Sequence, residues 1–176
     1  FSSGEHGNIF DFLIKIKNFK FGEAVRALAS EAGMPAYRFT KQDEERDNRW
    51  KIYNNILEKY VDFFNQKLSS NKNLEAYKYL ENRKLTTEEI KLFKIGYVPH
   101  DNDFYQILKK EFTNEQLKSS GIYYFDEQKG KYIDRFKGRI IFPVKNLNGM
   151  IIALGGRSIS KNYFAKYINS PETEFY

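Results

Sequence analysis

The sequence predicts an α+β fold, in which a helical N-terminal part is followed by a small, mostly antiparallel sheet with flanking helices. Apolar residues recur at helical spacing over much of the first two thirds of the chain. Two short apolar runs, Ile140–Val144 and Met150–Leu154, come later. The link between these runs contains Asn148-Gly149, a dipeptide typical of hairpin turns, which favours two paired strands.

Two helices are predicted near the N-terminus. Asn8 is placed to cap a helix over Ile9–Lys17, with Asp11 in the first turn, where the helix dipole favours a negative charge. A second amphipathic helix is predicted from Phe21 to Ala32, and Gly33 provides a natural stop. We expect this second helix to serve packing.

A long helix is predicted from about Asp43 to Leu68. Its apolar stripe contains Tyr53, Ile56, Leu57, Tyr60, Val61, Phe64 and Leu68. Shorter helices are then expected at 74–83, from the Thr86/Glu89 capping box to Phe93, at 102–112, and from the Thr113/Gln116 capping box to Gly121. Two short strands at 122–125 and 131–133 complete the expected elements before the hairpin.

Composition limits the function without deciding it. The chain has 176 residues, and its 29 Lys and Arg against 23 Asp and Glu give a net charge of +6, which permits binding to nucleic acid. The absence of cysteine rules out disulfides and agrees with a cytosolic location. No apolar run approaches the roughly 20 residues that span a bilayer, so we expect no membrane association. The sequence begins at Phe1, without an initiating Met or the basic start of a signal peptide. The chain is therefore expected to be part of a longer protein.

Cationic side chains surround the predicted hairpin. Arg135, Lys137 and Arg139 precede it and Arg157 follows it. The polar segment with Lys166, Tyr167 and Asn169 comes next. A sheet can hold cations at fixed spacing on one surface, which suits a polyanion with regularly spaced phosphates. The alternative is a buried hairpin whose end charges are merely solvated.

The order of three sequence blocks resembles the core of bacterial DNA primases of the DnaG type. The blocks are D-R-F-K-G-R-I-I-F-P at Asp134–Pro143, G-G-R at Gly155–Arg157, and K-Y-I-N-S-P-E-T at Lys166–Thr173. Further matches are Y-L-x-x-R at Tyr79–Arg83, with Lys84 where the family has Gly, the F-x-x-G-Y-x-P of Phe93–Pro99, and Asn8–Phe12 with Glu23–Ala29 near the N-terminus.

The resemblance implies a division of the chain into three parts. Residues 1–36 would be the tail of a zinc-binding domain, 37–48 a linker, and 49–176 the N-terminal subdomain of the primase RNA polymerase core, without its Toprim module. The full-length protein would be a DNA-directed RNA polymerase, a nucleotidyltransferase that makes RNA primers on single-stranded DNA during replication in the bacterial cytoplasm.

The resemblance also implies binding roles for seven residues. It implies no catalytic residue in this chain. Arg83, Arg135, Arg139 and Arg157 would contact template or nucleotide phosphates, and the planar fork of arginine suits bidentate contact with phosphate. Lys166 would act as a point charge, Tyr167 would stack on a base or pack, and Asn169 would donate to phosphate or sugar. His100 is a weak candidate for a base, because it has no partner nearby in the sequence.

Metals and further partners are implied for the full-length enzyme. Mg or Mn would be held by an E-G-Y-M-D-like block and a D-x-D of the Toprim module, and we expect neither here, so this chain alone should be inactive. Zinc belongs to the family's ribbon. It is not expected here, because Ser3 stands where the last Cys would be and His6 alone cannot bind it.

The expected partners are single-stranded DNA template, nucleoside triphosphates, the RNA primer, and the replicative helicase through an absent C-terminal region. Two alternatives stay open. One is a primase-helicase of phage or organellar type, and the other is a non-catalytic module that binds single-stranded DNA.

Overall fold

The computed structural model describes residues 7–35, 40–72, 74–160 and 165–176. Ser3 and His6, on which the expectation about zinc depends, lie outside them, as do residue 36 and residues 37–39 of the predicted linker. In order, the elements are α1 (Ile9–Lys17), α2 (Phe21–Glu31), α3 (Lys41–Ser70), α4 (Glu75–Asn82), α5 (Thr87–Leu92), β1 (Gly96–Val98), α6 (Phe104–Leu108), α7 (Asn114–Ser119), β2 (Tyr123–Asp126), β3 (Lys131–Asp134), β4 (Arg139–Lys145), β5 (Ile151–Ser158) and β6 (Tyr167–Asn169).

The chain forms two compact units, Phe1–Arg49 and Trp50–Tyr176, and the division falls inside α3. In the first unit, α1 begins with a capping box in which Asn8 and Asp11 bond to each other's backbone N–H, as the sequence predicts. The left-handed φ of 65° at Gly33 suits the predicted end of α2. The long helix begins at Lys41, before the predicted Asp43, because Thr40 and Asp43 exchange capping bonds.

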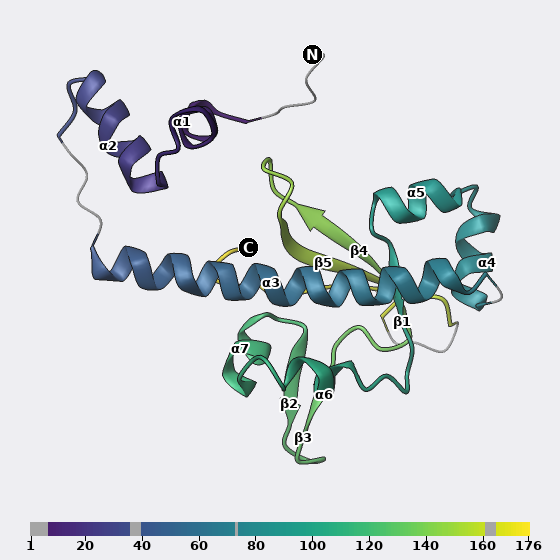
Figure 1. The fold of residues 1–176 in the computed structure, drawn as a ribbon. Coiled ribbons are helices and arrows are strands. Elements are labelled where there is room, and N and C mark those ends of the chain that lie inside the picture. Colours follow the sequence, from purple (N-terminus) through teal and green to yellow (C-terminus); the bar gives the residue numbers. More distant parts are fainter. Residues whose placement is uncertain (1–6, 36–39, 73, 161–164) are drawn as a thin grey trace. The chain divides into compact units, whose positions relative to one another are not determined.

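The second unit contains two antiparallel sheets. One has the strand order β1-β4-β5-β6, and the other consists of β2 and β3. Figure 1 shows α3 as the long central helix, with the β4–β5 hairpin to one side and β2, β3, α6 and α7 to the other. The predicted hairpin is confirmed, with Pro143 paired with Leu154 and a positive φ of 78° at Gly149.

The core lies between α3 and one face of the larger sheet. All seven residues of the predicted α3 stripe are buried, as the helical periodicity requires. Six of them join a cluster with Ile141 and Leu154 of the sheet, and the seventh, Leu68, belongs to a second cluster. This second cluster, which also includes Leu80 and Ile90, packs α4 and α5 against Ile140. Because Ile140 and Ile141 are neighbours on a strand, they point to opposite faces, and the sheet is therefore covered from both sides near β1 and β4.

Three expectations about elements need correction. Strands β1 and β6 were not predicted; each has three residues, too few for an alternating pattern to be visible in the sequence. The helix predicted at 102–112 is shorter, because α6 ends at Leu108 and turns carry the chain to Phe112. Arg139 and Arg157 lie within β4 and β5 and not beyond the ends of the hairpin. The predicted α+β fold class is otherwise confirmed.

Candidate nucleic-acid interface

The strand register decides which cations share a face of the larger sheet. Arg157 pairs with Ile140 on β4 and with Tyr167 on β6, so these three side chains lie on one face. Arg139 pairs with Ser158 and therefore points to the opposite face. Since α4 packs on the Ile140 face, Arg157 emerges beside that helix.

Five side chains in and beside this face form a series of contacts in which cations alternate with aromatic rings. The Arg83 guanidinium carbon lies 5.4 Å from the Tyr79 ring centre, and that of Arg157 lies 5.0 Å from the same ring. Arg157 also lies 5.0 Å from the Tyr167 ring, and the Lys166 ammonium lies 5.9 Å from it. We call the set Arg83, Tyr79, Arg157, Tyr167 and Lys166 the cation–aromatic ladder. Each distance is within the range of cation–π attraction.

The two ends of the ladder are open to solvent. Arg83 and Lys166 are exposed, and the Tyr167 ring is 59% exposed. Arg157 is half-buried and donates from Nη1 to the Tyr167 hydroxyl. The ladder therefore combines exposed positive charge, which attracts phosphate, with an accessible ring on which a base can stack.

Asn169 lies on the same face, one step along β6. It pairs with Gly155, and its Oδ1 is 3.6 Å from the point where a Cβ on Gly155 would sit. The glycine therefore leaves the exposed amide clear of a neighbouring side chain. Arg83, Arg157, Lys166, Tyr167 and Asn169 are thus brought together by the structure, as five of the seven predicted site residues.

Arg139 occupies a different environment, since its side chain is only 5% exposed. Its Nη2 donates to the Ala165 carbonyl at 2.8 Å, and its Nη1 to the Lys166 carbonyl at 3.4 Å. In this arrangement Arg139 fixes the backbone that carries Lys166. Its predicted contact with phosphate stays a prediction.

Arg135 lies beside the smaller sheet. Its Nε donates to the Gly121 carbonyl at 3.1 Å, and its guanidinium carbon lies 5.4 Å from the Tyr124 ring centre. These contacts involve no residue of the ladder. The role predicted for Arg135 is therefore separate from that surface and also stays a prediction.

The Asp134 carboxylate explains the D-R-F part of the first motif. Asp134 accepts from the Phe136 N–H at 2.8 Å and from the Tyr60 hydroxyl at 2.8 and 2.9 Å. Burial raises the pKa of Asp134 from 3.8 to about 6, against the lowering effect of these hydrogen bonds. Phe136 is fully buried and would lie 2.6 Å from a Cβ on Gly156, which explains the second glycine of G-G-R.

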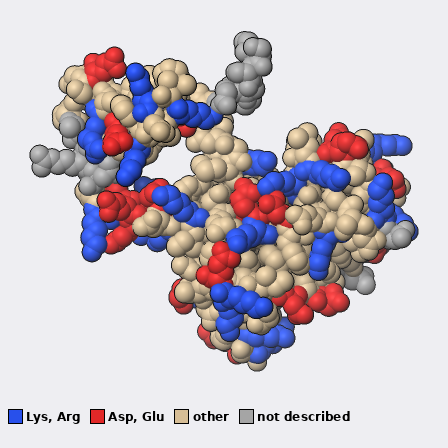
Figure 2. Space-filling model, viewed as in Figure 1, with Lys and Arg blue, Asp and Glu red and all other residues tan. Residues whose placement is uncertain are grey.

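Figure 2 shows Lys and Arg interspersed with Asp and Glu on the viewed face. The net charge of +6 is therefore not gathered there into one cationic stripe.

Sequence reasoning found the cations of the ladder and missed Tyr79. Its only sequence signal was its place in the Y-L-x-x-R block, four residues before Arg83 and hence one helical turn away.

The described residues do not fit a metal site, since none of them form a group of three or more His, Cys, Asp or Glu that could hold a cation. The expectation that the sequence has no D-x-D is wrong, because Asp101-Asn102-Asp103 has that form. Within the described ranges this triplet does not belong to a group of metal-ligating type. No helix in the described part is long and apolar enough to cross a membrane.

The fold and the ladder define a class of protein: a helix-flanked antiparallel domain with a cationic, tyrosine-bearing sheet face. Residues 63–176 match the family described as "DNA primase catalytic core, N-terminal domain". This match covers more than half of the chain, which therefore belongs to that family. The resemblance seen in the sequence motifs is confirmed.

Curated relatives include the DNA primases of Buchnera aphidicola subsp. Baizongia pistaciae and of Thermotoga maritima. Each is 35% identical to this chain and is matched over the whole of it. The chain spans about 30% of the length of these relatives.

Solved structures include one named as the DnaG primase catalytic domain bound to ssDNA. It is 30% identical with a TM-score of 0.66, and the match covers 74% of this chain and 42% of that one. The Aquifex aeolicus primase structure, named for its zinc-binding and RNA polymerase domains, is 27% identical with a TM-score of 0.63. There the match covers 97% of this chain and 40% of that one. These neighbours agree with the fold described above.

Proposed function

We propose that this chain supplies the basic, template-binding surface of a DNA primase. The full-length protein synthesises short RNA primers on single-stranded DNA during bacterial replication. Family membership supports the activity. A structural relative named as bound to ssDNA supports the ligand. The observation that carries the proposal is the ladder, because it brings three cations and an exposed ring into one series of contacts.

The ladder residues that contact DNA, together with Asn169, make different kinds of contact. Arg83 and Arg157 contact backbone phosphates through their planar forks, and Lys166 adds a point charge. Tyr167 offers its exposed ring to a base, and Asn169 donates its amide to phosphate or sugar. Because phosphate and stacking contacts carry little base information, binding is weakly dependent on sequence.

The remaining functions belong to the rest of the longer protein. Acidic residues of a Toprim module outside this chain would hold Mg or Mn, which would supply a Lewis acid for nucleotidyl transfer. Nucleotide phosphates bind on the same basic surface of this chain, whereas the replicative helicase binds through a C-terminal region and a zinc ribbon precedes the residues of α1. The protein acts in the cytoplasm, at the replisome. The domain division at 1–36, 37–48 and 49–176 is part of the same proposal.

Fluorescence anisotropy of a labelled oligonucleotide across a salt series tests the interface. Lys166→Ala is expected to weaken binding to all sequences about equally, because a phosphate contact is lost. It should also make the log–log salt slope shallower by roughly 0.7 or less, the value for one phosphate on a single strand. Circular dichroism should be unchanged, since Lys166 is exposed.

Lys91→Ala is the matched control. Lys91 is an exposed lysine of α5 and lies outside the ladder. If both variants weaken binding equally, the chain responds only to net charge and the interface has no support.

A separate assay tests whether this chain is inactive without the rest of the protein. The chain of residues 1–176 should make no primers with template, nucleotides and magnesium, and primer synthesis by a preparation free of other primases would contradict the proposal. The sequence that follows Tyr176 in the gene distinguishes a primase from a primase-helicase.

A further inference from the structure

We propose that Tyr79 is a positioning residue that holds Arg83 and Arg157 ready for contact with the phosphates of single-stranded DNA. The proposal rests on the proposed function, since it concerns the same surface. Charge patterning gives no sign of this role, because Tyr79 is uncharged and lies on α4, which is distant in the sequence from the strands that carry Arg157 and Tyr167.

One ring contacts two like charges. The guanidinium carbons of Arg83 and Arg157 lie 5.4 and 5.0 Å from the centre of the Tyr79 ring. Two guanidinium groups that share a neighbour repel each other, and both are attracted to the electron-rich face of an aromatic ring. Tyr79 therefore offsets the repulsion that would otherwise drive these arginines apart.

The polar atoms around this contact indicate that the ring of Tyr79, and not its hydroxyl, holds the two arginines. Its hydroxyl is buried and has no hydrogen-bond partner within the described ranges. The Nε of Arg157 is also buried and has no partner there. Arg157 is thus held by two rings and by the bond from its Nη1 to the Tyr167 hydroxyl. Phenylalanine should replace Tyr79 without loss, whereas leucine should not.

Positioning matters because a free arginine side chain has many rotamers. Ordering such a side chain when it meets a phosphate has an entropic cost, and a guanidinium that is already fixed avoids part of it. Tyr79 thus strengthens DNA binding without touching DNA. Its removal should affect binding only through the two arginines.

A first experiment needs no DNA. In the chain of residues 1–176, the Nε–H signal of Arg157 is recorded by ¹H–¹⁵N NMR and identified by its absence in Arg157→Lys. Tyr79→Leu should move this signal, because a ring current is lost, and should speed its exchange with water, because the buried Nε is uncovered. Tyr79→Phe should retain slow exchange. An unchanged signal in Tyr79→Leu would overturn the proposal.

A second experiment measures binding of a labelled single-stranded oligonucleotide. Tyr79→Leu should weaken binding by about two- to fivefold, the size of an exposed cation–π contact, and Tyr79→Phe should bind like the unmodified chain. In an Arg157→Ala background, Tyr79→Leu should have a smaller effect. Equal effects in both backgrounds would mean that Tyr79 acts on stability alone, which contradicts the positioning role.

The two proposals fail in different ways. If the unmodified chain binds no DNA, or if Arg157→Ala binds normally, the proposed function fails and the positioning role fails with it. If Arg157→Ala weakens binding and Tyr79→Leu does not, only the positioning role of Tyr79 is wrong.

Discussion

Replacing Asp134 by asparagine is expected to change how the stability of the protein depends on pH. Asp134 is only 5% exposed, and burial raises the pKa of its carboxyl from 3.8 to about 6. The folded state therefore binds this proton more tightly than the unfolded state does. The stabilisation from the bound proton is fully present below pH 3.8 and is lost as pH rises through about 6.

The size of the effect follows from the two pKa values. A difference between 3.8 and about 6 corresponds to about 3 kcal/mol over the whole titration. About 2 kcal/mol of this falls between pH 4.5 and pH 7.5. Asparagine keeps the size of the side chain and an acceptor oxygen for Tyr60 or Phe136, but it does not ionise.

Urea unfolding at pH 4.5 and pH 7.5 measures the effect. The unmodified protein should lose about 2 kcal/mol relative to Asp134→Asn between these two pH values, and the comparison cancels most other titrations. Glu127→Gln, which removes an exposed carboxylate from the turn between β2 and β3, is the control for the loss of one negative charge. A stability difference that is the same at both pH values would refute the reasoning.

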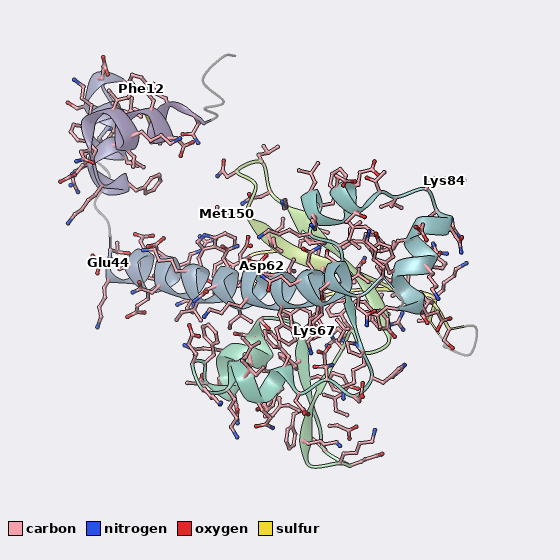
Figure 3. All side chains as sticks on the ribbon, turned by 45° about the vertical axis from the view of Figure 1, so that its right-hand side comes forward. Phe12, Glu44, Asp62, Lys67, Lys84 and Met150 are labelled. Carbon is pink, nitrogen blue, oxygen red and sulfur yellow. The ribbon has the colours of Figure 1, made fainter. Side chains whose placement is uncertain are left out.

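Two further predictions concern the backbone. Lys84 has a left-handed φ of 68° just after α4 and lies on the surface beyond the end of that helix (Figure 3). Lys84→Gly should therefore raise the free energy of unfolding by about 0.5–1 kcal/mol in urea melts, whereas Lys91→Gly inside α5 should lower it by a similar amount. Gly156→Ala should lower the free energy of unfolding by about 1–3 kcal/mol, because its Cβ would lie 2.6 Å from the Phe136 ring. A Gly156→Ala protein as stable as the unmodified one would show that Phe136 moves aside freely.

The sequence predicts most helices well because their signals are local. The α3 stripe from Tyr53 to Leu68 follows from a spacing of three and four residues, and each of its members is buried. The capping boxes at Thr86 and Thr113 start α5 and α7 as predicted, since a box involves residues only three apart. Lys84, which stands where the family has Gly, is also visible in the local sequence. The structure shows that the chain keeps the left-handed turn there without glycine.

The sequence alone thus determined the helical half, the central hairpin, the family and the set of cations around the hairpin. Only the tertiary structure decided which cations act together. Arg139 and Arg157 look equivalent in the sequence, but the register of β4 on β5 sends them to opposite faces, so one is buried and the other joins the ladder. Tyr79 joins Arg157 only because α4 packs on the Ile140 face of the sheet. Strand register and helix packing depend on contacts between residues far apart in the chain, and no local pattern contains them.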